Sequence, residues 1–281
     1  MRRSPHLILG NALFEFLLRR KASLQSELVW VHNPGEGRLR VSADALPIAS
    51  TATLLSRGDR SALEGVVAAL RAALAPHPGL DSFETERLAA THGVVTTDAH
   101  GARLQRPLSM TDDRGEISAG RREGVFLYEL VRRFAPQSIL ELGTAYGIGT
   151  MYLLAATDGR VLTVEGDPVR RQAATALFER HGVAARVQSV EGWFPDVLPG
   201  LLADCREPID FVYEDGPHIA DVTWRTFTAV VPALRPGALY VLDDVHHVAG
   251  NDEAWEQIQA HESVAASAEY NGRQGVCVIA G

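Results

Sequence analysis

The sequence is poor in the features that define several classes of protein. Its 281 residues include two cysteines, Cys205 and Cys277, which allow no zinc-binding spacing and indicate no disulfide framework. Acidic residues outnumber basic ones, giving a formal net charge of −8, so a basic nucleic-acid-binding surface is not expected. No apolar run reaches the length of a membrane-spanning helix, and repeats and low-complexity tracts are absent. We therefore expect a globular, cytoplasmic protein.

Short apolar segments alternate with amphipathic ones from Ser138 onward, and the connections between them are short. This alternation is typical of a doubly wound, mostly parallel α/β sheet of Rossmann-like type. Asn271-Gly272 is a strong hairpin signal between the last two strand-like segments, so we predict that the sheet ends in an antiparallel hairpin. Strands are predicted at 138–142, 160–165, 185–190, 209–215, 238–244, 264–270 and 275–280.

A glycine-rich loop joins the strand at 138–142 to a helix that we expect to begin at Thr150. Gly143, Gly147 and Gly149 allow a tight turn and a close approach of the backbone to a ligand at the helix N-terminus. The spacing, Glu-x-Gly-x-x-x-Gly-x-Gly, differs from the Gly-x-Gly-x-x-Gly fingerprint of dinucleotide-binding domains. It resembles the first motif of class I S-adenosylmethionine-dependent methyltransferases. The alternative is a glycine loop in an ordinary α/β domain.

This resemblance implies that S-adenosylmethionine binds along the loop, with Glu141 at its charged amino group or at a bound water. Glu165 ends the second strand, where a carboxylate can accept hydrogen bonds from both ribose hydroxyls. Trp193 is expected to border the adenine, and its alternative role is that of a core aromatic residue. The residues that we expect to bind the cofactor are Met110, Glu141, Gly143, Thr144, Tyr146, Gly147, Gly149, Glu165, Gly192, Trp193 and Asp215.

Three carboxylates follow the fourth and fifth predicted strands. Asp215 ends the segment 209–215, and Asp243 and Asp244 end the segment 238–244. Neighbouring parallel strands end about 5 Å apart at one edge of a sheet, where ligands bind in doubly wound folds. Clustered carboxylates repel one another unless a cation lies among them, and an oxygen-only set suits Mg²⁺ or Ca²⁺. The alternative is that these acids cap helices without a metal.

The two segments around these acids carry a more specific resemblance. Asp-Phe-Val-Tyr-Glu-Asp-Gly-Pro-His (210–218) and Gly-Ala-Leu-Tyr-Val-Leu-Asp-Asp-Val-His (237–246) are similar to paired motifs of metal-dependent O-methyltransferases. They fit the macrocin-type sugar methyltransferases, with catechol-type enzymes more distant, and the resemblance covers about residues 110–281. Glu214 departs from the family pattern, which usually has an apolar residue there. The resemblance implies a divalent ion, Mg²⁺, held by Asp215, Asp243 and Asp244.

Two histidines lie close to the acids in the sequence. His218 follows Asp215 by three positions, and His246 follows Asp244 by two. The resemblance implies that one of the two takes the proton of the methyl acceptor, beside Asp215 at the catalytic centre. The alternative for either histidine is a structural role.

Residues 1–118 are interpreted as a separate, mostly helical domain, and residues 119–281 as the methyltransferase domain. Helices are predicted at 7–20, 61–74 and 83–92, and a hairpin at 27–42. Two short strands near 94–97 and 102–106 complete the helix–helix–wing order of a winged-helix unit. That order is similar to the dimerisation domains of some small-molecule O-methyltransferases and, loosely, to peptide-binding domains of ribosomal-peptide-modifying enzymes.

These features predict an S-adenosylmethionine-dependent O-methyltransferase, assisted by a divalent metal, that acts on a hydroxyl of a sugar, phenol or peptide. One alternative is a metal-independent carboxyl- or N-methyltransferase with a histidine base, including a peptide-modifying enzyme. Others are a nicotinamide oxidoreductase and a non-catalytic binding module. We expect a homodimer, from the resemblance, and no nucleic-acid or membrane partner.

Overall fold

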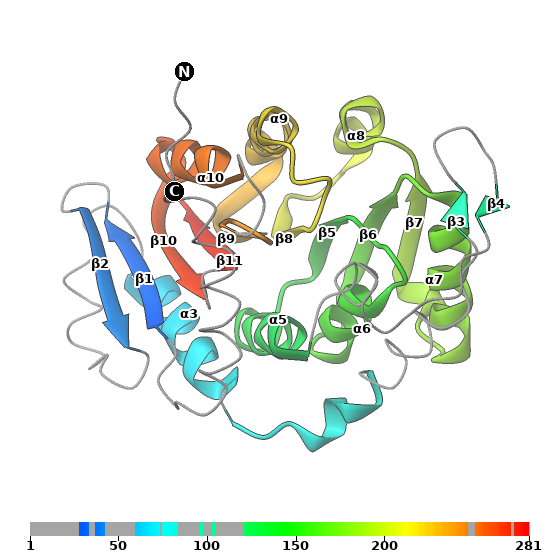
Figure 1. Ribbon diagram of the computed structural model, residues 1–281, viewed down its shortest axis with the longest axis horizontal. Coiled ribbons are helices and arrows are strands. Elements are labelled where there is room, and N and C mark those ends of the chain that lie inside the picture. The colour runs from blue at the N-terminus through cyan, green and yellow to red at the C-terminus, as the bar shows by residue number, and fades with distance from the viewer. Residues whose placement is uncertain are drawn as a thin grey trace.

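Within the described part of the chain, nine strands form a central sheet in the order β2-β1-β10-β11-β9-β8-β5-β6-β7 (Figure 1). The computed structural model describes residues 28–33, 37–42, 60–73, 75–83, 96–97, 103–104, 121–246, 251–270 and 273–280. The strands of the sheet are β1 (Leu28–Asn33), β2 (Gly37–Ser42), β5 (Ser138–Leu142), β6 (Arg160–Glu165), β7 (Val187–Glu191), β8 (Ile209–Glu214), β9 (Leu234–Leu242), β10 (Val264–Tyr270) and β11 (Gln274–Ile279).

The strands β9, β8, β5, β6 and β7 run parallel to one another, as the alternation of the sequence predicts. The chain then closes with the predicted hairpin, in which β10 and β11 pair antiparallel. The last strand, β11, does not lie at the edge. It fits between β10 and β9 and is antiparallel to both, with Gly275 opposite Leu242. The predicted Rossmann-like sheet ending in an antiparallel hairpin is therefore confirmed.

Helices cover both faces of the sheet (Figure 1). On one face lie α3 (Arg60–Ala73), α5 (Arg121–Phe134), α6 (Ile148–Ala155) and α7 (Pro168–Arg180). On the other lie α8 (Phe194–Asp204), α9 (Ala220–Val230) and α10 (Asn251–Ala260). Short 3₁₀ turns occur at η2 (Pro78–Leu80), η4 (Ala184–Arg186) and η5 (Val231–Ala233).

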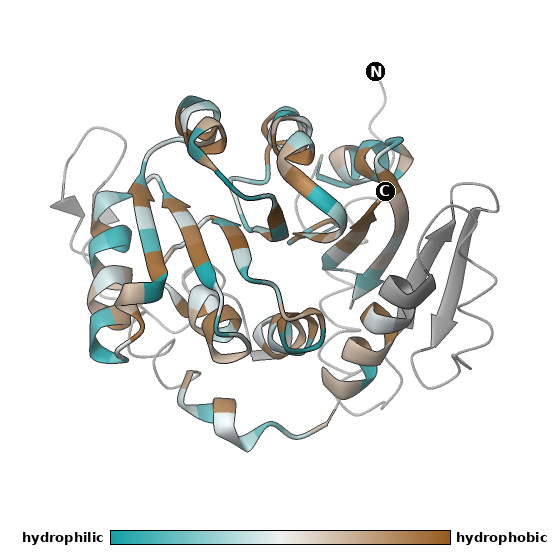
Figure 2. Cartoon of the chain, turned by 180° about the vertical axis from the view of Figure 1, so that it is seen from behind, coloured by the Kyte–Doolittle hydropathy of each residue, from teal (hydrophilic) through white to brown (hydrophobic). Residues whose placement is uncertain are grey.

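Both faces of the sheet carry an apolar core among the described residues, formed by one cluster under α8, α9 and α10 and by two neighbouring clusters on the other face. A strand that is buried on both sides needs a nearly continuous apolar run. This holds for β5 and β8, whose side chains pack into the apolar cores of both faces. Figure 2 shows apolar residues on the strands and on the helix sides that face them. Among the described residues, no helix combines the length and the apolar character that crossing a membrane requires.

Some predicted boundaries shift for local reasons. The helix after the glycine loop begins at Ile148 instead of Thr150, because Gly147 already serves as its N-cap in a left-handed conformation, with φ of 85°. Strand β7 begins at Val187 because the residues before it form the turn η4. Strand β9 begins at Leu234, four residues earlier than predicted.

The described part of residues 1–118 is continuous with the main sheet. The predicted hairpin is present as β1 and β2, and β1 pairs antiparallel with β10, with Val31 opposite Ala268. Helix α3 shares a core with α5, with Leu70 and Phe126 in one cluster. A separate two-stranded pair, β3 (Thr96–Thr97) and β4 (Arg103–Leu104), lies where the wing is predicted. The predicted helix at 7–20, most of the one at 83–92 and the segment 105–120 lie outside the described residues.

Candidate active site

A cavity of about 360 Å³ lies at the carboxyl edge of the parallel strands. Its walls come from the segments that follow β5, β6, β7, β8 and β9, so one space collects residues from five strand ends. Its volume falls within the usual range of small-molecule sites. The predicted site residues that line it are Gly143, Glu165, Gly192, Trp193, Asp215, His218 and Asp244.

The three glycines of the loop have different roles. Gly143 lines the cavity with φ of 100°, and a Cβ there would lie 2.0 Å from the backbone oxygen of Asp215. Only glycine permits this approach between the ends of β5 and β8. A Cβ at Gly147 would lie 2.7 Å from the Phe178 ring, and one at Gly149 would lie 2.9 Å from Glu141 Oε1. Gly147 and Gly149 thus allow side chains to pack closely behind the loop, and neither glycine lines the cavity.

Glu141 lies behind the loop as well. Its carboxyl is fully buried and accepts hydrogen bonds from Thr150 Oγ1 at 2.5 Å and Thr163 Oγ1 at 2.6 Å. Burial raises the pKa of Glu141 to about 8, against the lowering effect of the two threonine hydroxyls. Thr144 and Tyr146 are also buried, and Thr144 Oγ1 lies 2.5 Å from Thr163 Oγ1. None of the predicted residues Glu141, Thr144 and Tyr146 lines the cavity.

Glu165 is held rigidly at the cavity wall. Its Oε2 accepts the backbone N–H of Ala145 at 2.7 Å, and its Oε1 accepts that of Asp167 at 2.9 Å. Ala145 itself has φ of 45°, and the non-glycine residues His218 and Asp244 also have positive φ, of 51° and 54°. All three line the cavity, so left-handed backbone, which is costly for side chains other than glycine, gathers at this site.

Trp193 presents a flat apolar surface to the cavity. The side chain is 42% exposed, and its ring stacks on Phe194 with centroids 6.0 Å apart and planes 10° apart. Large aromatic side chains are rarely left this open without a partner. The exposure disfavours the alternative in which Trp193 belongs to the core.

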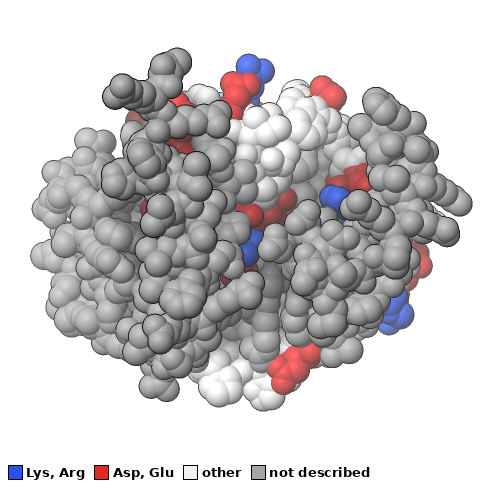
Figure 3. Space-filling view, viewed as in Figure 1, with Lys and Arg blue, Asp and Glu red and all other residues white. Residues whose placement is uncertain are grey.

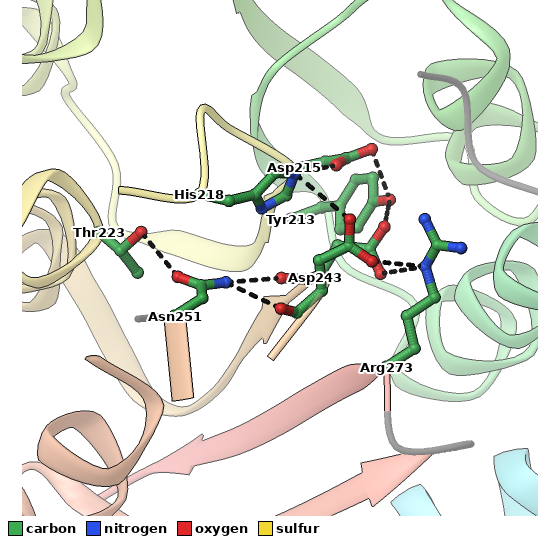
Figure 4. Close-up of polar contacts among 8 residues, drawn as sticks. Tyr213, Asp215, His218, Thr223, Asp243, Asn251 and Arg273 are labelled. Carbon is green, nitrogen blue, oxygen red and sulfur yellow. Dashed lines mark hydrogen bonds and ion pairs between the residues drawn. The ribbon is translucent and has the colours of Figure 1, made fainter. Parts of the chain in front are cut away.

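The aspartates that the sequence places after β8 and β9 come together: Figure 4 shows Asp215 near Asp243, and Asp244 contacts the same histidine as Asp215. The Tyr213 hydroxyl lies 3.2 Å from Asp215 Oδ2 and 3.4 Å from Asp243 Oδ2. His218 Nε2 lies 3.6 Å from Asp215 Oδ1 and 3.5 Å from Asp244 Oδ2. A phenol and an imidazole therefore bridge the ends of the two strands.

The loop that carries Asp243 and Asp244 is fixed from behind. Asn251, at the start of α10, donates from Nδ2 to the carbonyl oxygens of Asp243 at 3.3 Å and Asp244 at 3.1 Å. The Thr223 hydroxyl of α9 in turn donates to Asn251 Oδ1 at 3.3 Å. Side chains of α9 and α10 thus hold the backbone of Asp243 and Asp244, and of these two residues Asp244 lines the cavity.

The charges of the cluster are balanced in part by an arginine. Burial and the charge of Asp244 raise the pKa of Asp215 to about 7, and burial and Asp215 raise the pKa of Asp243 well above its usual value. Arg273 Nε lies 2.7 Å from Asp244 Oδ1 and 3.7 Å from Asp243 Oδ1. Figure 3 shows acidic and basic side chains together in the hollow at the centre of one face.

The predicted metal site can be compared with this arrangement. Three carboxylates have the right chemistry for a hard divalent ion. Their placement does not fit one: within the part of the chain that the structure describes, no group of three acidic, histidine or cysteine side chains has the geometry to hold a metal ion. The Arg273 guanidinium contacts two of the three acids instead.

Comparison with known proteins adds an independent observation. Residues 140–245 match a family described as a methyltransferase domain, and this range contains the loop, Glu165 and all three aspartates. The chain contains a class I S-adenosylmethionine-dependent methyltransferase domain.

Several proteins similar to this methyltransferase domain are named O-methyltransferases. A catechol O-methyltransferase of Niastella koreensis is 32% identical over 134 residues, which are 46% of this chain and 58% of that enzyme. A demethylmacrocin O-methyltransferase of Streptomyces fradiae is 29% identical over 37% of this chain and 20% of that enzyme. An O-methyltransferase of Streptomyces achromogenes involved in tomaymycin synthesis, solved in complex with SAM, is 26% identical. Its TM-score is 0.52, and the likeness covers 59% of this chain and 82% of that one.

Three further predicted residues do not line the cavity or lie outside the described residues. Asp243 is buried and does not line the cavity, although its neighbour Asp244 does. His246 does not line the cavity, and its Nε2 lies 2.9 Å from Glu269 Oε2. Glu269 also accepts a hydrogen bond from Trp255 Nε1 at 2.6 Å, so His246 belongs to a buried polar network at β10. Met110 lies outside the described residues.

Sequence reasoning missed four residues of the site. Tyr213 lies two positions before Asp215. Because side chains two apart along a strand point to the same side, this spacing could have predicted that the two residues lie together. Arg170 lines the cavity one turn into α7, next to the Asp167 N-cap. Arg273 and Asn251 carry no local signal, because the sheet order and the packing of α10 bring them to the aspartates.

Proposed function

We propose that this chain transfers the methyl group of S-adenosylmethionine to a hydroxyl oxygen of a small molecule. The observation that carries the proposal is a single cavity lined by two kinds of residue. Gly143, Glu165 and Trp193 suit a nucleoside cofactor, and His218 and Asp215 lie beside them. The named O-methyltransferase relatives and the SAM-bound relative support the same activity.

The cavity fits the cofactor in three respects. Gly143 lines the cavity at the end of β5, where its backbone can face a ligand. Glu165, held by two backbone N–H groups, keeps lone pairs that can accept hydrogen bonds from ribose hydroxyls. The open ring of Trp193 offers a stacking surface for adenine.

His218 is the base that the geometry favours. When bound, S-adenosylmethionine supplies an electrophilic methyl group on a sulfonium. His218 takes the hydroxyl proton while the oxygen–carbon bond forms and the carbon–sulfur bond breaks, which leaves S-adenosylhomocysteine. Asp215 and Asp244, within 3.6 Å of His218 Nε2, stabilise the charged imidazole that results. The cavity walls align the acceptor, and such alignment can lower a barrier by several kcal/mol.

The acceptor class is inferred from the relatives and the site. A catechol is a phenol, and the two named relatives share transfer to oxygen. We propose a phenol, sugar or peptide hydroxyl. The divalent ion stays a prediction. The Arg273 contacts favour transfer to the hydroxyl without a metal, and they do not bear on the carboxyl- or N-methyltransferase alternative.

Cofactor binding tests the proposal directly. We expect S-adenosylhomocysteine to bind in calorimetry, and Glu165→Gln to weaken binding about tenfold because a charged acceptor is lost. Arg225→Gln, at an exposed ion pair on α9, is the matched control and leaves binding unchanged. Incubation with S-adenosylmethionine and a panel of phenols, sugars and peptides, followed by mass spectrometry, then identifies the acceptor. Binding of NADH without binding of S-adenosylhomocysteine would overturn the assignment.

A further inference from the structure

The backbone of Arg273 is anchored to the loop that carries the aspartates. Arg273 lies between β10 and β11, and its N–H donates to the Tyr270 carbonyl at 3.0 Å. Its own carbonyl accepts the N–H of Val245 at 2.8 Å, one residue after Asp244. The arginine is therefore tied by its main chain to the segment that its side chain contacts.

The side chain then reaches into the acidic cluster, as Figure 4 shows. Nε lies 2.7 Å from Asp244 Oδ1 and 3.7 Å from Asp243 Oδ1, and the side chain is only 25% exposed. The contact is an ion pair without the alignment of a hydrogen bond. Asp215 and Glu123, at the start of α5, add negative charge around the same guanidinium. Acidic groups from three parts of the chain thus face one cation.

We propose that the Arg273 guanidinium is the resident cation of this site and takes the place that a divalent ion is predicted to hold. This inference rests on the proposed methyl transfer and names a positioning residue for it. Clustered carboxylates need a nearby positive charge to stay together. A guanidinium supplies that charge at every physiological pH.

The same contact explains why a metal is not needed. A divalent ion among the three aspartates would lie within a few ångströms of Arg273, where like charges repel strongly in a partly buried site. Asp243 and Asp244 are already engaged by the arginine, and His218 lies against Asp215 and Asp244. The site therefore holds its acids and its base in place with groups of the chain alone.

Binding of Mn²⁺ to the full chain tests the inference, with the paramagnetic resonance signal of free Mn²⁺ as the readout. We expect the wild-type chain, stripped with a chelator and exchanged, to bind no Mn²⁺ at this site. Arg273→Gln removes the charge while keeping most of the shape, and we expect its Mn²⁺ affinity to rise about tenfold or more. Mn²⁺ then raises the unfolding midpoint of this variant by about 2–4 °C and leaves that of the wild type unchanged.

Two variants serve as controls. Arg273→Lys keeps a positive charge, so it should bind Mn²⁺ no better than the wild type. Arg225→Gln removes an exposed arginine that pairs with Asp221 at 2.9 Å, and it should leave Mn²⁺ binding unchanged. A merely structural role for Arg273 would lower stability in the Gln and Lys variants alike, without creating Mn²⁺ affinity in either.

Several results would overturn the inference. Tight Mn²⁺ binding by the wild-type chain contradicts it, whatever the variants do. So does an Arg273→Gln variant that folds and gains no Mn²⁺ affinity. If that variant folds only with Mn²⁺ present, the inference is supported. S-adenosylhomocysteine binding is measured on the same samples. If the wild-type chain does not bind S-adenosylhomocysteine, the proposed function is wrong. If it binds both S-adenosylhomocysteine and Mn²⁺ tightly, only this inference is wrong.

Discussion

His218 and His246 follow acidic motifs of the same kind, yet their side chains have different partners. His218 lines the cavity and lies between Asp215 and Asp244. His246 contacts the buried Glu269 and does not line the cavity. Both histidines are candidates for the base in the sequence, and only the position of each ring separates them.

Substituting each histidine by asparagine, which tolerates the φ of 51° at position 218, should give opposite results. His218→Asn should lower turnover of the acceptor found in the panel by about 10²–10⁴-fold, because the proton acceptor is lost. Its affinity for S-adenosylhomocysteine should stay unchanged in calorimetry. His246→Asn should keep turnover but lower the free energy of unfolding by about 1–3 kcal/mol, because the buried Glu269 carboxyl loses a partner. Full turnover in His218→Asn would contradict the assigned base.

Helix α6 contains a glycine in its first turn and helix α8 one in its interior, for different reasons. In α6, a Cβ at Gly149 would lie 2.9 Å from Glu141 Oε1 and 3.2 Å from the Tyr213 ring. In α8, a Cβ at Gly200 would meet nothing within 4 Å. The glycine of α6 is required by the close packing of the helix on β5 and β8, whereas that of α8 only weakens its helix.

Alanine at these two positions should therefore change stability in opposite directions. Gly149→Ala should lower the free energy of unfolding by about 1–3 kcal/mol, because the methyl group overpacks a buried carboxyl. Gly200→Ala should raise it by about 0.5–1 kcal/mol, because alanine favours an open helical site. Urea unfolding of both variants and the wild type measures the difference. Equal effects at the two sites would show that Gly149 is not packed against Glu141.

On the scale of the whole molecule, the sheet carries buried acids in both of its cores. On one face Glu141 accepts hydrogen bonds from two threonine hydroxyls, and on the other Glu214 accepts one from the Tyr240 hydroxyl. Burial raises the pKa of each carboxyl to about 8, from a usual value of 4.5. The folded chain therefore keeps protons on these groups in a pH range where the unfolded chain has lost them.

Stability should consequently fall as pH rises from about 5 to 8, because the folded state binds more protons than the unfolded state in that window. Glu214→Gln mimics the neutral acid, so we expect it to remove at least about 1 kcal/mol of this decline. Glu207→Gln, at an exposed position, is the control and should leave the slope unchanged. Urea unfolding across this pH range provides the measurement. A slope in Glu214→Gln equal to that of the wild type would show that Glu214 is ionised in the folded protein.

Much of the fold could be predicted because its signals are local. Apolar runs of strand length bounded by turns place β5, β6 and β8 within a residue of their observed bounds. The rule that parallel strands end at one edge is enough to predict that Asp215 lies beside Asp243. The roles of Gly147 and Gly149 could not be predicted, because Phe178 and Glu141 meet them only after α6 packs on the sheet.

The sequence by itself determined the alternation of strands and helices, the glycine turn and the three aspartates at the carboxyl edge, since each depends on residues close together in the chain. Only the tertiary structure decided which cation meets those aspartates. Strand β11 inserts between β10 and β9, and this order places Arg273 beside Asp244 although the two are distant in sequence. No local pattern encodes that contact, because it arises from the pairing of strands far apart along the chain.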